Sequence, residues 1–160
     1  MNRAIVPSIA RCTTASLLCL ILIAPFAKTW GDDHSAAVTA ARAVMDDFLR
    51  TFNAGDVSGL ADTLLFPHVR VASGGVVVIP DKAAFVAGTD MAEFARRFNW
   101  AHSEWDAIEV IQAGPEKVHF KVQFSRFDPQ GQRNATFQSL YIIQKVEDRW
   151  GVRARSSFAP

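Results

Sequence analysis

The residues best suited to chemistry lie in the stretch FPHVRVASGGVVVIPDK, residues 66–82, which has the pattern of two short strands around a glycine pair. His68 and Arg70 are two residues apart on the first strand, so their side chains leave the same face. Histidine can act as a base near neutral pH, and the planar fork of arginine suits an anionic group. Val69 and Val71 make the opposite face apolar, which favours that face for the core and puts His68 and Arg70 outside or at the mouth of a cavity. Two interpretations stay open for the pair: the lining of a binding site, or structural and interface residues.

Further candidates follow the later predicted strands. Phe120 and Phe124 belong to an apolar row within residues 117–127, and this row ends at Arg126, near a cavity rim. Arg126 could bind a ligand, or it could be a snorkelling or ion-paired arginine. Tyr141 is the single tyrosine, and its hydroxyl could donate into an apolar cavity or satisfy a backbone carbonyl. The residues that alternate with the apolar row should face water or a dimer partner: His119, Lys121, Gln123 and Ser125.

The segment HSEWD places an aromatic side chain and carboxylates on opposite faces of a strand. Trp105 could form an aromatic wall of a ligand site. Glu104 and Asp106 share the other face, where they could be an acid/base pair. Two carboxylates on a solvated surface are the commoner arrangement, and we favour that interpretation.

The last strand, RARSSF, places Arg153, Arg155 and Ser157 on one face by strict alternation. Two arginines on one face could bind an anion or pair with acidic residues of a neighbouring strand or subunit, and we favour pairing. No His-x-His, HExxH or acidic cluster occurs with ligand spacing, so no metal site and no cofactor are expected. No glycine-rich phosphate loop and no G-x-S-x-G nucleophile motif is present.

The beginning of the chain has the layout of a secretory signal peptide. Arg3 and Arg11 precede the apolar run of residues 15–27, which is too short to span a bilayer at roughly 20 residues. We therefore expect residues 1–31 to be a signal peptide and the mature protein to be secreted or periplasmic, without stable membrane insertion. An uncleaved membrane anchor is the alternative.

Removal of this leader changes the chemistry of the chain. Both cysteines, Cys12 and Cys19, are lost, so the mature domain has no thiol and no disulfide. Removal of the leader's three basic residues leaves 14 basic against 16 acidic residues, a net charge of −2. No basic run survives, which argues against nucleic acid as a partner. Residues 32–160 are expected to form a single domain, since about 100–200 residues per domain is usual.

Periodicity predicts the order of elements. A helical stripe covers residues 35–53, with Ser35 as its cap and Gly55 as a left-handed stop. Asp56 caps a second helix through Leu65. A hairpin follows, and then a third helical region that Asp81 caps and that Gly88-Thr89 splits. Four long strands complete the chain, over residues 103–113, 117–127, 135–146 and 150–158. About three helices before an antiparallel meander indicate an α+β fold.

This order resembles the nuclear transport factor 2-like superfamily, the cystatin-like α+β cones that include SnoaL-like polyketide cyclases and ketosteroid isomerase. The residues that carry the resemblance are FLRTFNAGDVSGLADTLL, like the opening helix and its break, and YIIQKVEDRWGVRARSSF, like the closing hairpin. The resemblance implies a curved sheet wrapped around helices, a tapered ligand cavity, and a homodimer through the outer sheet face. It does not imply an activity. The acids that ketosteroid isomerase and SnoaL-like cyclases carry in their strands have no counterpart here, since VRVASG and the later strands offer none.

Three hypotheses for function follow from these residues. The first is an exported domain that binds a small apolar or weakly anionic molecule without catalysing a reaction. The second is an isomerase, cyclase or dehydratase with His68 as base. The third is a dimeric protein-interaction module. The candidate catalytic residues are His68 and Tyr141, and the candidate ligand-binding residues are Arg70, Trp105, Phe120, Phe124 and Arg126.

Overall fold

The computed structural model describes residues 34–160. The predicted signal peptide, residues 1–31, lies outside the described residues. The elements, in chain order, are α1 (Ser35–Asn53), α2 (Val57–Asp62), β1 (Leu64–Ala72), β2 (Gly75–Ile79), α3 (Lys82–Ala87), α4 (Met91–Phe98), β3 (His102–Gly114), β4 (Lys117–Phe127), β5 (Arg133–Val146) and β6 (Arg149–Ser157).

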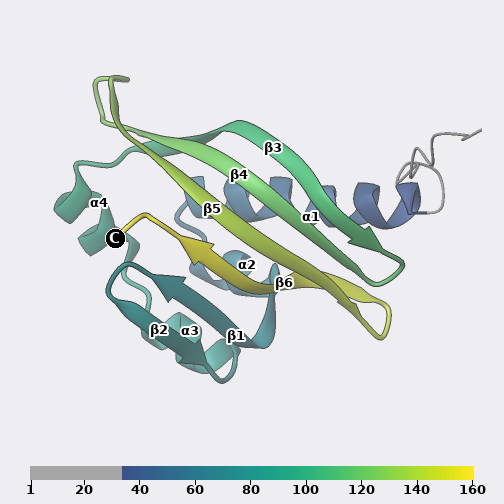
Figure 1. Cartoon of the computed structure of the whole chain (residues 1–160). Coiled ribbons are helices and arrows are strands. Elements are labelled where there is room, and N and C mark those ends of the chain that lie inside the picture. Colours follow the sequence, from purple (N-terminus) through teal and green to yellow (C-terminus); the bar gives the residue numbers. More distant parts are fainter. Residues whose placement is uncertain (1–33) are drawn as a thin grey trace, which may run out of the picture.

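All six described strands form one curved sheet in the order β2-β1-β6-β5-β4-β3 (Figure 1). β1 and β6 run parallel, and every other neighbouring pair is antiparallel. The long helix α1 crosses behind the sheet in this view, the short α3 lies behind the hairpin of β1 and β2, and α4 lies beside the end of β6. The predicted α+β class and the meander of four long strands are confirmed.

The helices form where the apolar stripe and the caps predict, with differences at their ends. α1 buries Ala37, Ala41, Met45 and Phe48 on one face, as the spacing of three and four requires. The Asp56 carboxylate accepts a hydrogen bond from the Gly59 amide at 2.9 Å, so the predicted cap of α2 is confirmed.

Two boundaries differ from the prediction. Ser35 is already the first helical residue, and no side chain caps α1. α2 ends at Asp62 instead of Leu65, because Leu64 and Leu65 are buried as the first residues of β1. The third helical region is two helices, and it divides at Gly88-Thr89 as predicted.

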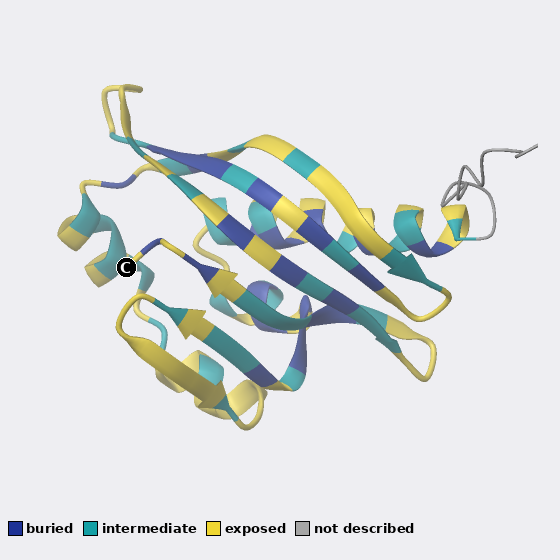
Figure 2. Ribbon diagram, viewed as in Figure 1, coloured by how far each residue is buried: buried dark blue, intermediate teal, exposed yellow. Residues whose placement is uncertain are grey.

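Alternation along the strands separates the core from the outer surface. In Figure 2, buried and exposed residues alternate along β4 and β5. The predicted apolar row of β4 faces the helices, with Val118, Phe120 and Val122 almost wholly buried. Ser125, expected to face water or a partner, lies on the outer face but is buried. The side chains of Asp106 and Arg133 cover it: its hydroxyl donates to Asp106 at 2.6 Å and accepts from Arg133 at 2.7 Å.

Gly151 tests the contact between β6 and the start of β1. A Cβ atom at this position would lie 2.9 Å from Leu65 Cγ and 3.1 Å from the Thr63 carbonyl oxygen. We expect Gly151→Ala to lower the free energy of unfolding by about 1–3 kcal/mol, because backbone atoms must move to admit the methyl group. Urea unfolding followed by circular dichroism measures this change. Gly74→Ala is the control, since no atom lies within 4 Å of its Cβ position; equal stabilities of the two variants would contradict the prediction.

Candidate functional site

A cavity of about 540 Å³ lies between the concave face of the sheet and the helices. The C-terminal half of α1, the helix α2, and α4 contribute to its wall, together with β1 to β6. Most of the lining is apolar and aromatic: Phe48, Phe52, Leu60, Leu64, Phe94, Phe98, Trp105 and Phe124. The cavity therefore offers a largely apolar environment of the size typical of small-molecule sites, about 300–1,000 Å³.

Arg126, at the end of the apolar row of β4, is buried in this wall and is only 5% exposed. Its Cζ atom lies 4.8 Å from the ring centroid of Phe94 and 4.9 Å from those of Phe98 and Phe137. Within residues 34–160, no carboxylate lies within 4 Å of its guanidinium and no hydrogen bond to it forms. Aromatic faces rather than a counter-ion therefore surround this cation.

Arg70 and Arg155 join Arg126 in the lining. They lie opposite each other where β1 pairs with β6. Burial, and after it the charges of Arg155 and Arg70, lower the pKa of Arg126 to about 10. Burial and the charge of Arg155 also lower the pKa of Arg70. The cause is the same at both positions: a cation removed from water beside other cations.

Three buried nitrogen atoms of the cavity wall have no hydrogen-bond partner within the described chain. They are Arg70 Nε, Arg126 Nε and Trp105 Nε1. Arg70 does donate through Nη2 to the main-chain oxygen of Pro160, the last residue of the sequence, at 2.9 Å, so one edge of its fork is held. Buried polar atoms without a partner are uncommon, and all three of these are donors. The wall is therefore arranged to give hydrogen bonds to an acceptor.

His68 lines the cavity and is 6% exposed. Its Nδ1 lies 3.1 Å from the Val152 carbonyl oxygen, which can only accept, so Nδ1 carries the hydrogen and Nε2 has a lone pair. The pKa of His68 is lowered to about 4, chiefly by burial and also by the charges of Arg155 and Arg70, although the hydrogen bond to the Val152 carbonyl raises it. The imidazole is neutral at pH 7.

The expectation that the apolar face of β1 turns inward is wrong. His68 and Arg70 face the cavity, whereas Val71 on the other face is 42% exposed. The reason is that the space behind this part of the sheet is a partly polar cavity instead of a filled core. An apolar row therefore does not identify the inner face of β1.

Tyr141 is 1% exposed and lines the cavity at the centre of β5. Its ring makes edge contacts with Phe48 and Trp105, with centroids 5.6 and 5.8 Å away. Its hydroxyl accepts a hydrogen bond from Arg155 Nη1 at 3.3 Å, which leaves the hydroxyl hydrogen available to a ligand. The structure brings Tyr141 together with His68, Arg70, Trp105, Phe124 and Arg126 around one cavity.

Phe120, in contrast, packs in the core and does not line the cavity. The N-terminal half of α1, which carries Ala37, Ala41 and Met45, covers that part of the sheet. The apolar row of β4 therefore divides into a core half and a cavity half. Phe124 belongs to the cavity half.

Glu104 and Asp106 also lie outside the cavity and do not form a pair. Asp106 Oδ1 lies 3.1 Å from Arg133 Nη1, and Glu104 Oε1 lies 3.4 Å from His102 Nε2. Both carboxylates have surface partners, as the favoured interpretation of this segment states.

A β-bulge in β6 corrects the expectation that Arg153 and Arg155 share a face. The ladder with β5 pairs Val152 with Ile143 and Ala154 with Ile142, so Arg153 has no opposite residue. Arg155 consequently turns inward, while Arg153 donates to the Phe66 carbonyl oxygen at 2.8 Å.

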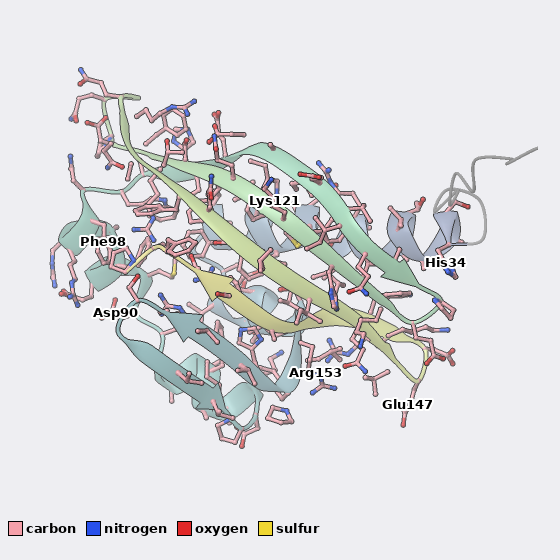
Figure 3. The ribbon with its side chains drawn as sticks, viewed as in Figure 1. His34, Asp90, Phe98, Lys121, Glu147 and Arg153 are labelled. Atoms are coloured by element: carbon pink, nitrogen blue, oxygen red, sulfur yellow. The ribbon has the colours of Figure 1, made fainter. Side chains whose placement is uncertain are left out.

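Arg153 lies apart from Asp90 and Phe98 at the two ends of α4 (Figure 3). Pairing with an acid of a neighbouring strand is not found, since no Asp or Glu side chain of the described chain lies within 4 Å of Arg153 or Arg155. Pairing with an acid of a neighbouring subunit stays a prediction.

Arg155 was considered above only as an anion-binding or paired residue of an arginine pair, and the α4 side chains were not predicted to line the cavity. The signal for α4 was present: Phe94 and Phe98 are four residues apart and share one helix face. The position of that face against Arg126 depends on the loop geometry around residues 88–90, which periodicity does not determine.

Among residues 34–160, no group of three or more His, Cys, Asp or Glu side chains is placed to bind a metal ion. In the same part of the chain, no helix has both the length and the hydrophobicity to cross a bilayer.

Comparison with known proteins identifies the family. The model of the NTF2-like protein family DUF6841 matches residues 33–157. The chain belongs to this family. Among curated proteins, no match was found. The resemblance to nuclear transport factor 2-like proteins is therefore confirmed at the level of family and fold.

Solved structures share this NTF2-like fold at low sequence identity. A protein of unknown function with a cystatin-like fold from Nostoc punctiforme has a TM-score of 0.64 at 11% identity, over 78% of this chain and 91% of that one. A protein of Catenulispora acidiphila in complex with S-DNPA has a TM-score of 0.60 at 13% identity, over 77% and 92%. A ketosteroid isomerase-like protein of Erwinia carotovora has a TM-score of 0.56 at 16% identity, over 79% and 99%. At these identities the likeness shows the fold alone.

The buried neutral His68 should make stability depend on pH. As the pH falls below 6.5 the unfolded chain takes up a proton at this position, whereas the folded chain does not until about pH 4. The free energy of unfolding therefore falls by on the order of 2–3 kcal/mol between about pH 7.5 and 4.5. We expect His68→Gln to remove this part of the pH dependence in urea unfolding.

His102→Gln, which removes a histidine outside the cavity, is the control and should keep the full pH dependence. A His68→Gln variant with the pH dependence of the unchanged protein would show that burial does not suppress protonation of His68.

Proposed function

We propose that the cavity binds a small molecule that is mainly apolar and at most weakly anionic, and that binding is the primary role of this domain. The observation that carries the proposal is a cavity of about 540 Å³ whose wall is mostly aromatic and aliphatic. Burial of an apolar ligand in such a space gains roughly 25 cal/mol per Å² of apolar surface removed from water. The few polar groups of the wall would orient the ligand.

The family and its structural neighbours support this proposal without deciding the ligand. The Catenulispora acidiphila protein was solved in complex with S-DNPA, so a protein of this fold can hold a small molecule. A shared fold does not carry an activity or a ligand with it. We further propose that residues 32–160 form one exported domain, secreted or periplasmic, after removal of the basic and apolar leader of residues 1–31.

A second candidate function is an isomerase, cyclase or dehydratase that uses His68 as base. The observation that favours it is the hydrogen bond to Val152, which fixes the tautomer and leaves the Nε2 lone pair as the basic site. Tyr141 and Arg126 would polarise a carbonyl group of the substrate. Exchange of a bound ketone's α-hydrogen with solvent deuterium, followed by NMR and abolished in His68→Gln, would support this reaction; equal exchange in both proteins would exclude His68 as the base.

Substitutions of two neighbouring β2 residues, which point to opposite faces of the sheet, test whether the cavity binds a ligand. Val77 lines the cavity and is half exposed, whereas its neighbour Val78 points to the other face and is 59% exposed. We expect Val77→Trp to weaken binding of the neutral probe N-phenyl-1-naphthylamine at least about tenfold, because the indole covers the cavity opening. Probe fluorescence measures the affinity, and Val78→Trp is the matched control. Equal affinities of the two variants, or no binding by the unchanged protein, would overturn the proposed function.

We also propose that the outer sheet face forms a homodimer. A shallow groove of about 170 Å³ there is lined by Val71, Ile111 and Leu140, each more than 40% exposed. A contiguous exposed apolar surface of this kind is typical of an interface. A dimer through this face would also agree with the third hypothesis above, a dimeric protein-interaction module.

The central position of Leu140 on β5 allows a direct test of the dimer. We expect Leu140→Glu to convert the dimer to a monomer, because a carboxylate would be buried without a partner in the interface. Native mass spectrometry measures the subunit number. Val86→Glu, on α3 and away from the groove, should leave the dimer intact. A monomer for the unchanged protein would contradict the proposal.

A further inference from the structure

We propose that the cavity contains a carboxylate subsite formed by Arg126, Arg70, Arg155 and Trp105, and that its ligands are small aromatic or alicyclic carboxylic acids. This inference rests on the proposed function and deepens it, because it assigns the polar end of the ligand. It does not depend on whether the domain also catalyses a reaction.

Several hydrogen-bond donors of the cavity wall have no partner. Arg126 Nε, Arg70 Nε and Trp105 Nε1 are buried and have no partner within the described residues. Tyr141 adds a hydroxyl hydrogen, since its oxygen already accepts from Arg155. The buried nitrogen atoms of this wall that have no partner are all donors, which matches a ligand group that only accepts, such as a carboxylate.

The cavity wall also carries more positive than negative charge near these donors. Arg126, Arg70 and Arg155 are close enough for the charge of each to influence another, and no Asp or Glu side chain of the described chain lies within 4 Å of any of them. Arg70 Nη2 alone has a partner at the end of the sequence, the main-chain oxygen of Pro160 at 2.9 Å. The acids in the cavity lining are Asp90 and Glu93, and both have other roles. Asp90 caps α4 by accepting from the Glu93 amide at 2.8 Å, and Glu93 forms an ion pair with Arg96. Arg126 is buried and Arg70 and Arg155 are half-buried. Cations withdrawn from water without an acidic side chain beside them are costly, and an anionic ligand would offset that cost.

The kind of donors in the wall favours a carboxylate over a phosphate. Phosphate sites commonly use the amides of a helix N-terminus or a glycine-rich loop. The N-terminus of α4, which lines the cavity, already has the Asp90 carboxylate as its acceptor. What the wall offers instead is the planar fork of arginine, held by three aromatic rings around Arg126. This geometry suits a planar monoanion.

The apolar residues of the cavity wall determine which non-polar group of the ligand the cavity can accept. Phe48, Phe52, Phe124 and the ring of Trp105 provide flat apolar surfaces. Aromatic and alicyclic rings pack against such surfaces with edge or offset contacts. The ligand class is therefore a ring system that carries one carboxylate, with a volume compatible with a cavity of about 540 Å³.

Isothermal titration calorimetry with three ligands of one shape tests the inference. The ligands are 2-naphthoate, its neutral isostere 2-naphthamide, and 2-naphthyl phosphate. We expect 2-naphthoate to bind at least about tenfold more tightly than either, because it gains charge-assisted hydrogen bonds that the amide lacks and that a dianion obtains only at a higher desolvation cost.

Variants of Arg126 then locate the subsite. Arg126→Gln should reduce the preference for 2-naphthoate over 2-naphthamide to about twofold or less, and Arg126→Lys should restore part of it. Arg133→Gln is the matched control, because it removes one positive charge from the outer face, where Arg133 pairs with Asp106. This control should keep the full preference.

The outcomes separate this inference from the proposed function. If 2-naphthamide and 2-naphthoate bind equally, the carboxylate subsite is wrong and the apolar binding site stands. If the phosphate binds most tightly, the ligand class is wrong. If none of the three ligands binds and N-phenyl-1-naphthylamine also fails to bind, the proposed function fails as well. An unchanged preference in Arg126→Gln would overturn the assignment of Arg126.

Discussion

In the parallel pairing of β1 with β6, Arg70 lies opposite Arg155 and His68 reaches the Val152 carbonyl oxygen. This pairing is the one contact that joins the N-terminal hairpin to the meander within a single sheet. It turns the polar face of β1 toward the helices and so supplies the cavity with its polar groups. The remainder of the wall comes from elements whose inward faces are apolar. Without this pairing the sheet would end at β6, and the cavity would lose His68, Arg70 and the β2 residues of its rim.

The cavity brings together groups that lower the stability of the folded chain. Burial of a cation without a counter-ion opposes folding, and Arg126 also lies near two other arginines. The three aromatic rings around Arg126 offset part of this cost through cation–π contact, at about 0.5–2 kcal/mol each. His68 avoids a similar cost by remaining neutral. Polar groups that oppose folding are retained where a ligand uses them, so these residues are better explained by binding than by structure.

The amino-acid sequence predicts the elements well and the cavity only in part. The stripe of α1, the caps at Asp56 and Asp81, and the four long strands follow from local periodicity and short-range hydrogen bonds, which act within a few residues. The inner face of β1 and the position of Arg155 do not follow. Strict alternation fails at the bulge beside Arg153, and the inner face of a sheet is not always its more apolar face when it borders a cavity. Phe120 was misplaced for a related reason: how far α1 extends over the sheet decides which part of an apolar row is core.

Binding and catalysis in this NTF2-like domain would be linked through charge. The positive charges of Arg155 and Arg70 help to hold the pKa of His68 near 4, at which the imidazole is a weak base. A carboxylate bound among the arginines would compensate those charges and raise the pKa of His68 toward its usual value. By the reciprocity of linked equilibria, protonation of His68 would then favour binding of the carboxylate. A domain that only binds has no need of this linkage, whereas an enzyme would obtain a stronger base only when its substrate is present. The arginine cluster thus supports both functions, and the chemistry of the ligand decides between them.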